Sequence, residues 1–243
     1  MREMSTHSDS LIARAKVEAL RRFDAGTLSN AIELLNLRPR NEGYIRDRQV
    51  SCLFPRLPPV AGFAATGRIR SASQPVHGHY YYDHAEWWRY VASVPPPRIV
   101  VLFDADDPPG AGALFGELHA RICAALDCVA YISNGAVRDL AAIERLGFPL
   151  FAGSVSPSHA YAHVVDFGGE IEIGGLKIQP GDLLFGDCNG VLSVPAAAVP
   201  HLPKLASEVL DREHAFIRTC LDGNFSIERL SREVRDYTRQ HER

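Results

Sequence analysis

Three charged residues, Glu117, Arg138 and Asp139, lie close to two places where the sequence predicts a helix to begin. Glu117 opens a helical run in which apolar residues recur every three or four positions. Arg138 and Asp139 follow a short predicted strand, residues 128–133. One step from helix to strand can return both points to the same rim of a sheet. Two carboxylates and a guanidinium on one rim would suit a divalent cation and an anionic substrate.

The elements that must position these residues predict an α/β fold. Residues 98–104 form a nearly continuous apolar run, which is typical of a strand buried on both faces. Asn134-Gly135 is a turn signal that should end the strand 128–133. We expect further strands over 61–71, 149–152, 170–173, 183–185 and 191–194, and helices over 8–24, 27–35, 77–92, 196–221 and from 226 to the end, with Thr27 or Ser29 capping the second helix.

Composition narrows the class of protein and its partners. The chain has 243 residues, of which 46% are hydrophobic and 23% charged, as expected of a globular protein with a substantial core. A net charge of −3 gives no basic footprint, so we expect no nucleic-acid partner. No apolar run approaches about 18 residues, so we expect no membrane partner. The five cysteines contain no CxxC pair, which favours reduced thiols and a cytoplasmic location.

Simpler interpretations stand beside the chemical one. Glu117 and Asp139 could be acidic residues favoured at helix starts by the dipole, and Arg138-Asp139 could be a surface ion pair of little energetic value. The histidines of residues 77–84 and 159–163 match no strong metal-ligand spacing. The aromatic cluster of residues 80–88 would be core or subunit interface, with a substrate lid as the alternative.

Four separated motifs carry a resemblance to a known family: GELHAR at 116–121, NGAVRD at 134–139, PGD at 180–182 and GDCNGVLSVP at 186–195. In this order they resemble the RraA-like family, which includes the class II pyruvate aldolases acting on 4-hydroxy-4-methyl-2-oxoglutarate and 4-carboxy-4-hydroxy-2-oxoadipate. The resemblance implies one RraA-like domain over 1–243, an α-β-β-α sandwich of the swivelling β/β/α type. Its core would span about 27–195, with an added N-terminal helix, 8–24, and a C-terminal helical arm, 196–243.

Beside the resemblance, the chemistry of the residues suggests individual roles for aldol cleavage. Asp139 would ligate Mg²⁺ or Mn²⁺, and Glu117 would hold one of the metal's waters as the base. The metal would chelate a 2-oxo acid and stabilise the developing pyruvate enolate. Arg138 would grip a carboxylate or enolate oxygen. The remaining substrate-binding candidates are Gly116, the backbone N–H groups of Leu118 and His119, and Asn134.

Relatives of this kind are homotrimers or dimers of trimers (hexamers) with the site at a subunit interface. A glutamate from the neighbouring subunit's C-terminal helix would then assist, with Glu213 as the candidate and Glu208 as the alternative. Asn134 stands where the family commonly has Asp. The aldolases' downstream Lys is missing here, so Tyr161 or His163 would have to replace it. We therefore expect the substrate-specific half of the site to differ.

The predicted function is a divalent-metal-dependent lyase that cleaves a 4-hydroxy-2-oxo acid to pyruvate and a second carbonyl compound. Oxaloacetate decarboxylation passes through the same enolate and is the expected companion activity. Two alternatives stay open. One is a regulatory protein acting by protein contact, like the ribonuclease E inhibitors of the same family. The other is a metal-dependent enzyme of different chemistry on a hydroxy or keto acid, such as an isomerase, dehydratase or hydrolase.

Overall fold

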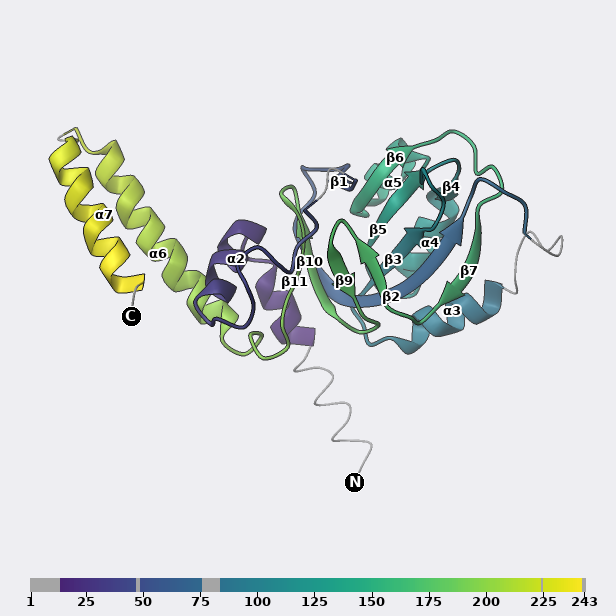
Figure 1. Ribbon diagram of the computed structural model, residues 1–243, viewed down its shortest axis with the longest axis horizontal. Helices are drawn as coiled ribbons and strands as arrows, with labels where there is room; N and C mark the ends of the chain where they lie inside the picture. Colours follow the sequence, from purple (N-terminus) through teal and green to yellow (C-terminus); the bar gives the residue numbers. More distant parts are fainter. Residues whose placement is uncertain (1–13, 47–48, 76–83, 224, 242–243) are drawn as a thin grey trace, which may run out of the picture.

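The chain forms the mixed α/β structure that the sequence predicts, with a nine-stranded sheet as its central layer (Figure 1). The computed structural model describes residues 14–46, 49–75, 84–223 and 225–241. The strands are β1 Ser51–Cys52, β2 Val60–Arg70, β3 Arg98–Asp104, β4 Ala113–Phe115, β5 Cys128–Val137, β6 Leu150–Val155, β7 His163–Phe167, β8 Ile171–Ile173, β9 Leu176–Ile178, β10 Leu183–Asp187 and β11 Gly190–Ser193. The helices are 14–20, α2 Ala25–Glu33, α3 His84–Ser93, α4 Glu117–Ala125, α5 Leu140–Leu146, α6 Leu202–Leu221 and α7 Ile227–His241.

The parallel part of the sheet decides where functional side chains gather. Strands β2, β3, β5 and β6 are neighbours and run parallel, and β4 also pairs with β5 in parallel. Helices α3, α4 and α5 lie in the connections that lead into β3, β5 and β6. Because each connection returns the chain to the same end of the sheet, the carboxyl ends of these strands lie along one edge. Antiparallel strands β1, β7, β10 and β11 complete the sheet.

Each face of the parallel strands has its own hydrophobic core. One face packs against α3, α4 and α5 through residues such as Trp87, Cys123 and Ile143. The other face is covered by the two-stranded β8–β9 hairpin, whose apolar side chains pack on β2, β3 and β5. A third cluster joins the helix 14–20, α2 and the first half of α6 to β10 and β11. The layers are therefore helix, sheet and hairpin, with a helical arm at one end (Figure 1).

Several predicted boundaries are wrong in an informative way. The strand expected to end at residue 133 continues to Val137, because the Asn134 side chain bonds the backbone of β3 and Gly135 allows close packing against Asp104, so neither residue makes a turn. The second helix begins at Ala25, and its cap is Asp24, whose carboxylate accepts the Thr27 N–H at 2.8 Å. The first helix ends at residue 20, and its predicted start lies outside the described residues. Strands β1, β4, β7 and β9 were not predicted.

Arg98 is a buried cation that ties two helix ends to the sheet. Its side chain stands at the start of β3, and the residue is 9% exposed. The guanidinium donates to the backbone oxygens of Val94 at 2.6 Å, Leu126 at 2.6 Å and Ala92 at 2.8 Å. These carbonyls belong to the ends of α3 and α4, where the helix dipole favours a positive charge. Arg98 therefore satisfies three acceptors that have no donor within their own helices.

We expect Arg98→Met to lower the free energy of unfolding by about 3 kcal/mol, because the apolar chain keeps the volume but leaves buried acceptors without a donor. Urea unfolding followed by far-UV circular dichroism measures this loss. Arg89→Met on the exposed face of α3 is the matched control and should change stability by less than about 0.5 kcal/mol. Equal effects of the two substitutions would show that the Arg98 hydrogen bonds do not stabilise the fold.

Candidate active site

Glu117, Arg138 and Asp139 lie together where β4 and β5 end. The two strands pair in parallel with Phe115 opposite Val137, and the Arg138 N–H donates to the Phe115 carbonyl at 3.0 Å. Glu117 opens α4 directly after β4, and Asp139 precedes α5 directly after β5. The parallel pairing thus brings together two segments that are about twenty residues apart in the chain. Carboxyl ends of parallel strands are where α/β proteins commonly build their ligand sites.

The Asp139 carboxylate faces the neighbouring helix. Asp139 has left-handed backbone angles, φ 60° and ψ 33°, which Asp tolerates better than most residues. It heads α5, yet its side chain makes no capping bond there. Its Oδ2 accepts the backbone N–H of Glu117, the first residue of α4, at 3.0 Å. The side chain remains 45% exposed, so the carboxylate is fixed at one oxygen and accessible from solvent.

Arg138 has an unsatisfied donor at the centre of the site. Its Nε is buried and has no hydrogen-bond partner among the described residues. The nearest carboxylate oxygen, Asp139 Oδ2, is 3.8 Å away, which is an ion-pair distance and too long for a hydrogen bond. Buried donors in folded proteins are nearly always paired. An anionic oxygen arriving beside Arg138 would satisfy this one.

Gly116 makes room for these side chains. A Cβ built at this position would lie 2.5 Å from Asp139 Oδ2 and 3.0 Å from both Cγ and Nε of Arg138. The backbone here is extended, with φ −144°, so space explains the glycine and backbone strain does not. Any larger residue would push the guanidinium and the carboxylate apart.

We expect Gly116→Ala to displace Arg138 and Asp139, which should weaken Mn²⁺ binding at least tenfold and lower stability by about 1–3 kcal/mol. Electron paramagnetic resonance of free Mn²⁺ measures the affinity. Gly223→Ala is the control, because a Cβ there would meet nothing within 4 Å. Unchanged Mn²⁺ affinity in the folded Gly116→Ala variant would contradict the placement of the site.

A second arginine belongs to the site, and sequence reasoning missed it. Arg121 donates through Nε and Nη2 to Oε1 of Glu117 at 2.9 and 2.7 Å. The pair is exposed and spaced i,i+4 on α4, so it contributes only about 0.3–0.5 kcal/mol to stability. The four-residue spacing on a predicted helix was the signal that could have revealed it.

Two other predicted substrate-binding residues, Leu118 and His119, lie in the first turn of α4 but face different surroundings. The first helical bond of α4 runs from the Ala120 N–H to Gly116, so the N–H of Leu118 points out of the helix start, and its side chain is 69% exposed. His119 lies in the same turn, but its ring packs against Phe115 and Trp88 with centroids 6.1 and 6.0 Å away. The imidazole therefore faces the helical layer.

Asn134 is engaged by hydrogen bonds to the backbone of β3. Its side-chain oxygen accepts the Asp104 N–H at 2.7 Å, and its amide donates to the Asp104 carbonyl at 3.0 Å. The Asp104 carboxylate in turn accepts from Gly110 N–H at 2.8 Å, and burial raises the pKa of this carboxyl. Asn134 thus fastens β5 to β3 and supports the loop after Asp104. A buried amide whose oxygen and nitrogen are both hydrogen-bonded to β3 is poorly placed to bind substrate directly.

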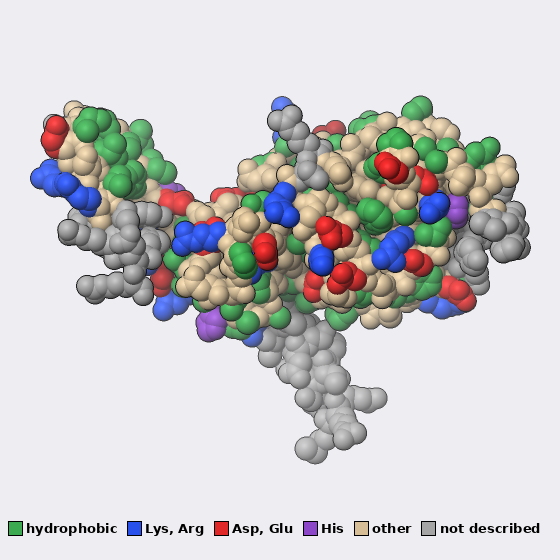
Figure 2. Space-filling model, viewed as in Figure 1, with side chains coloured by type: hydrophobic (Ala, Val, Ile, Leu, Met, Phe, Trp, Pro, Cys, Tyr) green, Lys and Arg blue, Asp and Glu red, His purple; other side chains and the backbone are tan. Residues whose placement is uncertain are grey.

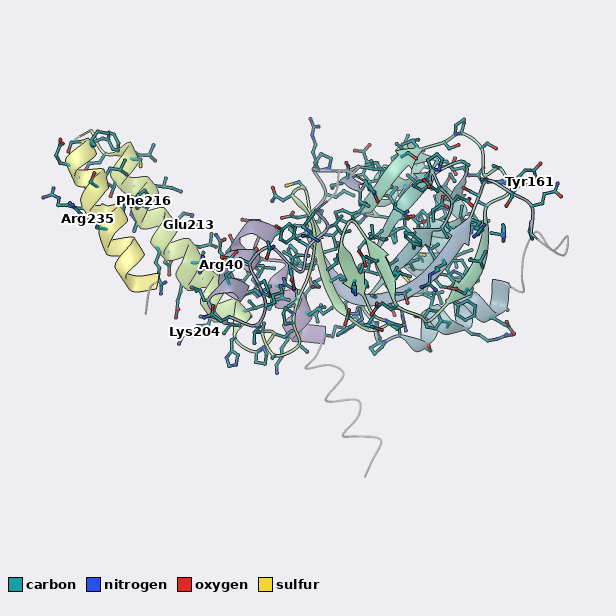
Figure 3. All side chains as sticks on the ribbon, viewed as in Figure 1. Arg40, Tyr161, Lys204, Glu213, Phe216 and Arg235 are labelled. Carbon is teal, nitrogen blue, oxygen red and sulfur yellow. The ribbon has the colours of Figure 1, made fainter. Side chains whose placement is uncertain are left out.

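Glu213 and Glu208 lie on α6, away from the sheet edge that carries Glu117 and Asp139 in the same chain (Figures 1 and 3). Glu213 accepts from the Asn30 side chain at 3.2 Å, and Glu208 pairs with Lys204 and Arg212 at 3.8 and 3.9 Å. Neither glutamate can reach Asp139 of its own chain. A role for either one requires a second subunit.

The arm that carries these glutamates has an unburied apolar surface. The α6–α7 hairpin extends beyond the sheet, and hydrophobic side chains gather at its far end (Figure 2). Leu221 is 80% exposed, and the other large apolar residues that are exposed in the described part of the arm are Ile217, Phe225, Ile227 and Val234. Of the two suggested replacements for the missing lysine, His163 is buried in β7 and bonds the Tyr161 carbonyl, whereas Tyr161 is exposed (Figure 3).

The donor set of the site fits a hard divalent cation. Among the described residues no group of three or more His, Cys, Asp or Glu side chains could enclose a metal ion. The accessible carboxylate of Asp139, with Glu117 next to it in space, offers few protein oxygens. Mg²⁺ and Mn²⁺ accept such sites because they retain several waters. The chemistry of the donors therefore suits Mg²⁺ or Mn²⁺ better than Zn²⁺.

The structure is an α/β protein with a mixed sheet and a carboxylate–guanidinium pair at the edge where its parallel strands end. A family model described as RraA-like, Aldolase/RraA, matches residues 27–193 of this sequence. The chain therefore belongs to the RraA-like family, as its motifs predicted.

Individual relatives are more distant. A Halalkalibacterium halodurans protein provisionally named 4-hydroxy-4-methyl-2-oxoglutarate aldolase is 31% identical over 132 residues, which is 54% of this chain and 62% of that protein. An uncharacterized Methanocaldococcus jannaschii protein is 30% identical over 38% of this chain and 45% of its own length. The chain thus spans less than two thirds of these curated relatives.

Solved structures show the same fold. An uncharacterized protein from Pseudomonas syringae superposes with a TM-score of 0.69 at 19% identity, covering 90% of this chain and 93% of its own. The Streptomyces coelicolor protein RraAS2, described as an unusual member of the RNase ES inhibitor RraA family, gives a TM-score of 0.65 at 19% identity over 84% and 96% of the two chains. In the described part of the chain, no helix is long and apolar enough to span a membrane.

Proposed function

We propose that this chain is a divalent-metal-dependent lyase that cleaves a 4-hydroxy-2-oxo acid into pyruvate and a second carbonyl compound. The observation that carries the proposal is the unsatisfied Arg138 Nε beside the accessible carboxylate of Asp139. An anionic oxygen would supply the hydrogen bond that the buried cationic donor lacks, and a cation would balance the charge of the neighbouring carboxylate. A 2-oxo acid chelated to a metal would supply both. The provisional aldolase name of the H. halodurans relative supports the same chemistry.

The residues divide the work of cleavage. Arg138 binds the carboxylate or the 2-oxo oxygen with its planar donors, and the N–H of Leu118 at the start of α4 adds a second contact to the same anion. Asp139 and Glu117 would hold Mg²⁺ or Mn²⁺, which when bound supplies Lewis-acid stabilisation of the enolate. Glu117 would hold a water that takes the proton from the C4 hydroxyl. The C3–C4 bond then breaks, C4 becomes the second carbonyl, and the pyruvate fragment regains a proton at C3.

Oxaloacetate decarboxylation is proposed as a companion activity, because loss of its C4 carboxylate leaves the same enolate. The five cysteines are all unpaired, which is consistent with action in the reducing cytoplasm. Which acceptor the lyase uses should depend on surfaces around the site that differ among relatives, since loops carry most specificity.

The enzyme would act as a homotrimer or a dimer of trimers with its site between subunits. Two features of the chain support this part of the proposal. The site edge is open, with Leu118 and Asp139 exposed, and the arm presents apolar side chains that its own chain does not cover. A neighbouring copy could cover both surfaces and deliver Glu213, or Glu208, to the site. Exposed apolar patches of this kind commonly mark subunit contacts.

Pyruvate release tests the reaction, with oxaloacetate and a panel of 4-hydroxy-2-oxo acids supplied in the presence of Mg²⁺ or Mn²⁺. We expect turnover that EDTA removes and added metal restores.

Asp139→Ala should abolish metal-dependent turnover, because it removes the direct ligand. Arg138→Ala should raise KM for the 2-oxo acid by tenfold or more, because it removes a charged contact to substrate. Full activity and metal affinity in Asp139→Ala would refute the site.

Complementation tests the shared site. Asp139→Asn and Glu213→Gln should each be nearly inactive as pure oligomers. If Asp139 and Glu213 meet across an interface, random mixing of the two variants leaves about a quarter of the sites with both residues intact. Co-refolded mixtures should therefore recover up to about a quarter of wild-type activity. An active monomer in gel filtration, or a fully active Glu213→Gln variant, would contradict the shared role of Glu213, and Glu208→Gln would then be compared.

A regulatory function is the alternative, and one observation supports it. RraAS2 has the same fold and is described as an unusual member of a family of ribonuclease inhibitors. A surface that acts by protein contact has no need for an unsatisfied arginine beside an accessible carboxylate. Absence of both turnover and Mn²⁺ binding would favour the regulatory function. Mn²⁺ binding without pyruvate release would favour an isomerase, dehydratase or hydrolase at the same site.

A further inference from the structure

Arg121 is a charged side chain at the candidate site to which the cleavage mechanism above gives no role. It lies on α4 four residues after Glu117, so the two side chains share one face of the helix. Its Nε and Nη2 both donate to Glu117 Oε1, at 2.9 and 2.7 Å. Within the described ranges this is the one ion pair of Arg121. Two of the three guanidinium nitrogens thus donate to one oxygen of the proposed water-holding carboxylate.

The hydrogen bonds from Arg121 to Oε1 affect what the second carboxylate oxygen of Glu117, Oε2, can do. A glutamate side chain rotates about three bonds, and an exposed one samples many conformations. The grip of Arg121 on Oε1 selects the conformations in which that oxygen is engaged. Oε2 has no hydrogen-bond partner in the part of the chain that the structure describes. It keeps its full capacity to accept a hydrogen bond from water.

We propose that Arg121 is a positioning residue that holds Glu117 by Oε1 and so presents Oε2 to the water from which the substrate proton is taken. This inference rests on the proposed lyase function and deepens it. Arg121 touches neither the substrate nor the metal, and acts only through Glu117. Its substitution should therefore change the rate of the chemical step and leave substrate binding unaltered.

The size of the effect follows from the exposure of the pair. Arg121 is 61% exposed, and an exposed ion pair shifts the population of a side-chain conformation only a few-fold. We expect Arg121→Ala to lower kcat about three- to tenfold, with KM for the 2-oxo acid unchanged within about twofold. Arg121→Lys should recover part of the loss, because an ammonium at i+4 can still bond Oε1. Arg145→Ala, at an exposed arginine of α5, is the control for loss of surface charge.

A double-mutant cycle separates positioning from direct contact. In a Glu117→Ala background, Arg121→Ala should have no further effect on kcat, because the group through which it acts is gone. A loss of equal size in both backgrounds would overturn the proposal. So would an increase in KM that persists without Glu117, since that result would place Arg121 in contact with substrate.

The Mn²⁺ complex tests the geometry independently of turnover. A crystal structure of the wild-type complex should show Glu117 Oε2 within hydrogen-bond distance of a water on Mn²⁺, and this contact should be lost or disordered in Arg121→Ala. Mn²⁺ affinity should stay equal or rise in that variant, because a nearby positive charge has been removed. A wild-type structure with Oε2 turned away would overturn the positioning role. Wild-type protein that shows the contact but releases no pyruvate would refute the lyase function and leave the positioning role standing.

Discussion

The parallel pairing of β4 with β5 is the constraint on which the candidate site depends. β4 is only three residues long, Ala113–Phe115, yet it sets the starting point of α4 opposite the end of β5. A shift of one residue in this pairing would turn Phe115 away from the helical core and move Glu117 relative to Asp139. The buried stack of Phe115 on Tyr131, with ring centroids 3.9 Å apart, opposes such a shift. Core packing beneath the sheet edge therefore fixes the charged groups above it.

Space is the second constraint at this edge. The chain passes through Gly116 with ordinary extended angles, but three atoms of Arg138 and Asp139 occupy the volume that a side chain would need. Gly135 is constrained by lack of space in the same way, because a Cβ there would lie 3.0 Å from atoms of Asp104. In both places a glycine lets the backbone approach an acidic residue closely. The missing side chains thus do as much to shape the site as the charged ones.

The sequence predicted what depends on local pattern and could not predict what depends on contacts between strands. The apolar run 98–104 became β3 with the predicted bounds, because burial on both faces leaves a continuous hydrophobic signal. Asn134-Gly135 was interpreted as a turn because those residue types favour turns, yet here the amide pairs with β3 and the glycine makes space. The space that Gly116 leaves for Arg138 and Asp139, and the lack of a hydrogen-bond partner for Arg138 Nε, depend on contacts between residues far apart in the chain, so the sequence could not reveal them. Arg121 was within reach of a spacing argument and was overlooked.

The charges at the site cancel in pairs, and this balance bears on what it can bind. Glu117 is matched by Arg121, and Asp139 lies beside Arg138 at 3.8 Å. Without a ligand, neither arginine adds net attraction for an anion. A divalent cation at Asp139 would tip the balance and leave a positive site whose Arg138 donor is already desolvated. Anion binding and metal binding should therefore be coupled, with each ligand raising the affinity of the other by linkage. The proposed site would therefore bind a chelating anion together with its metal better than either one alone.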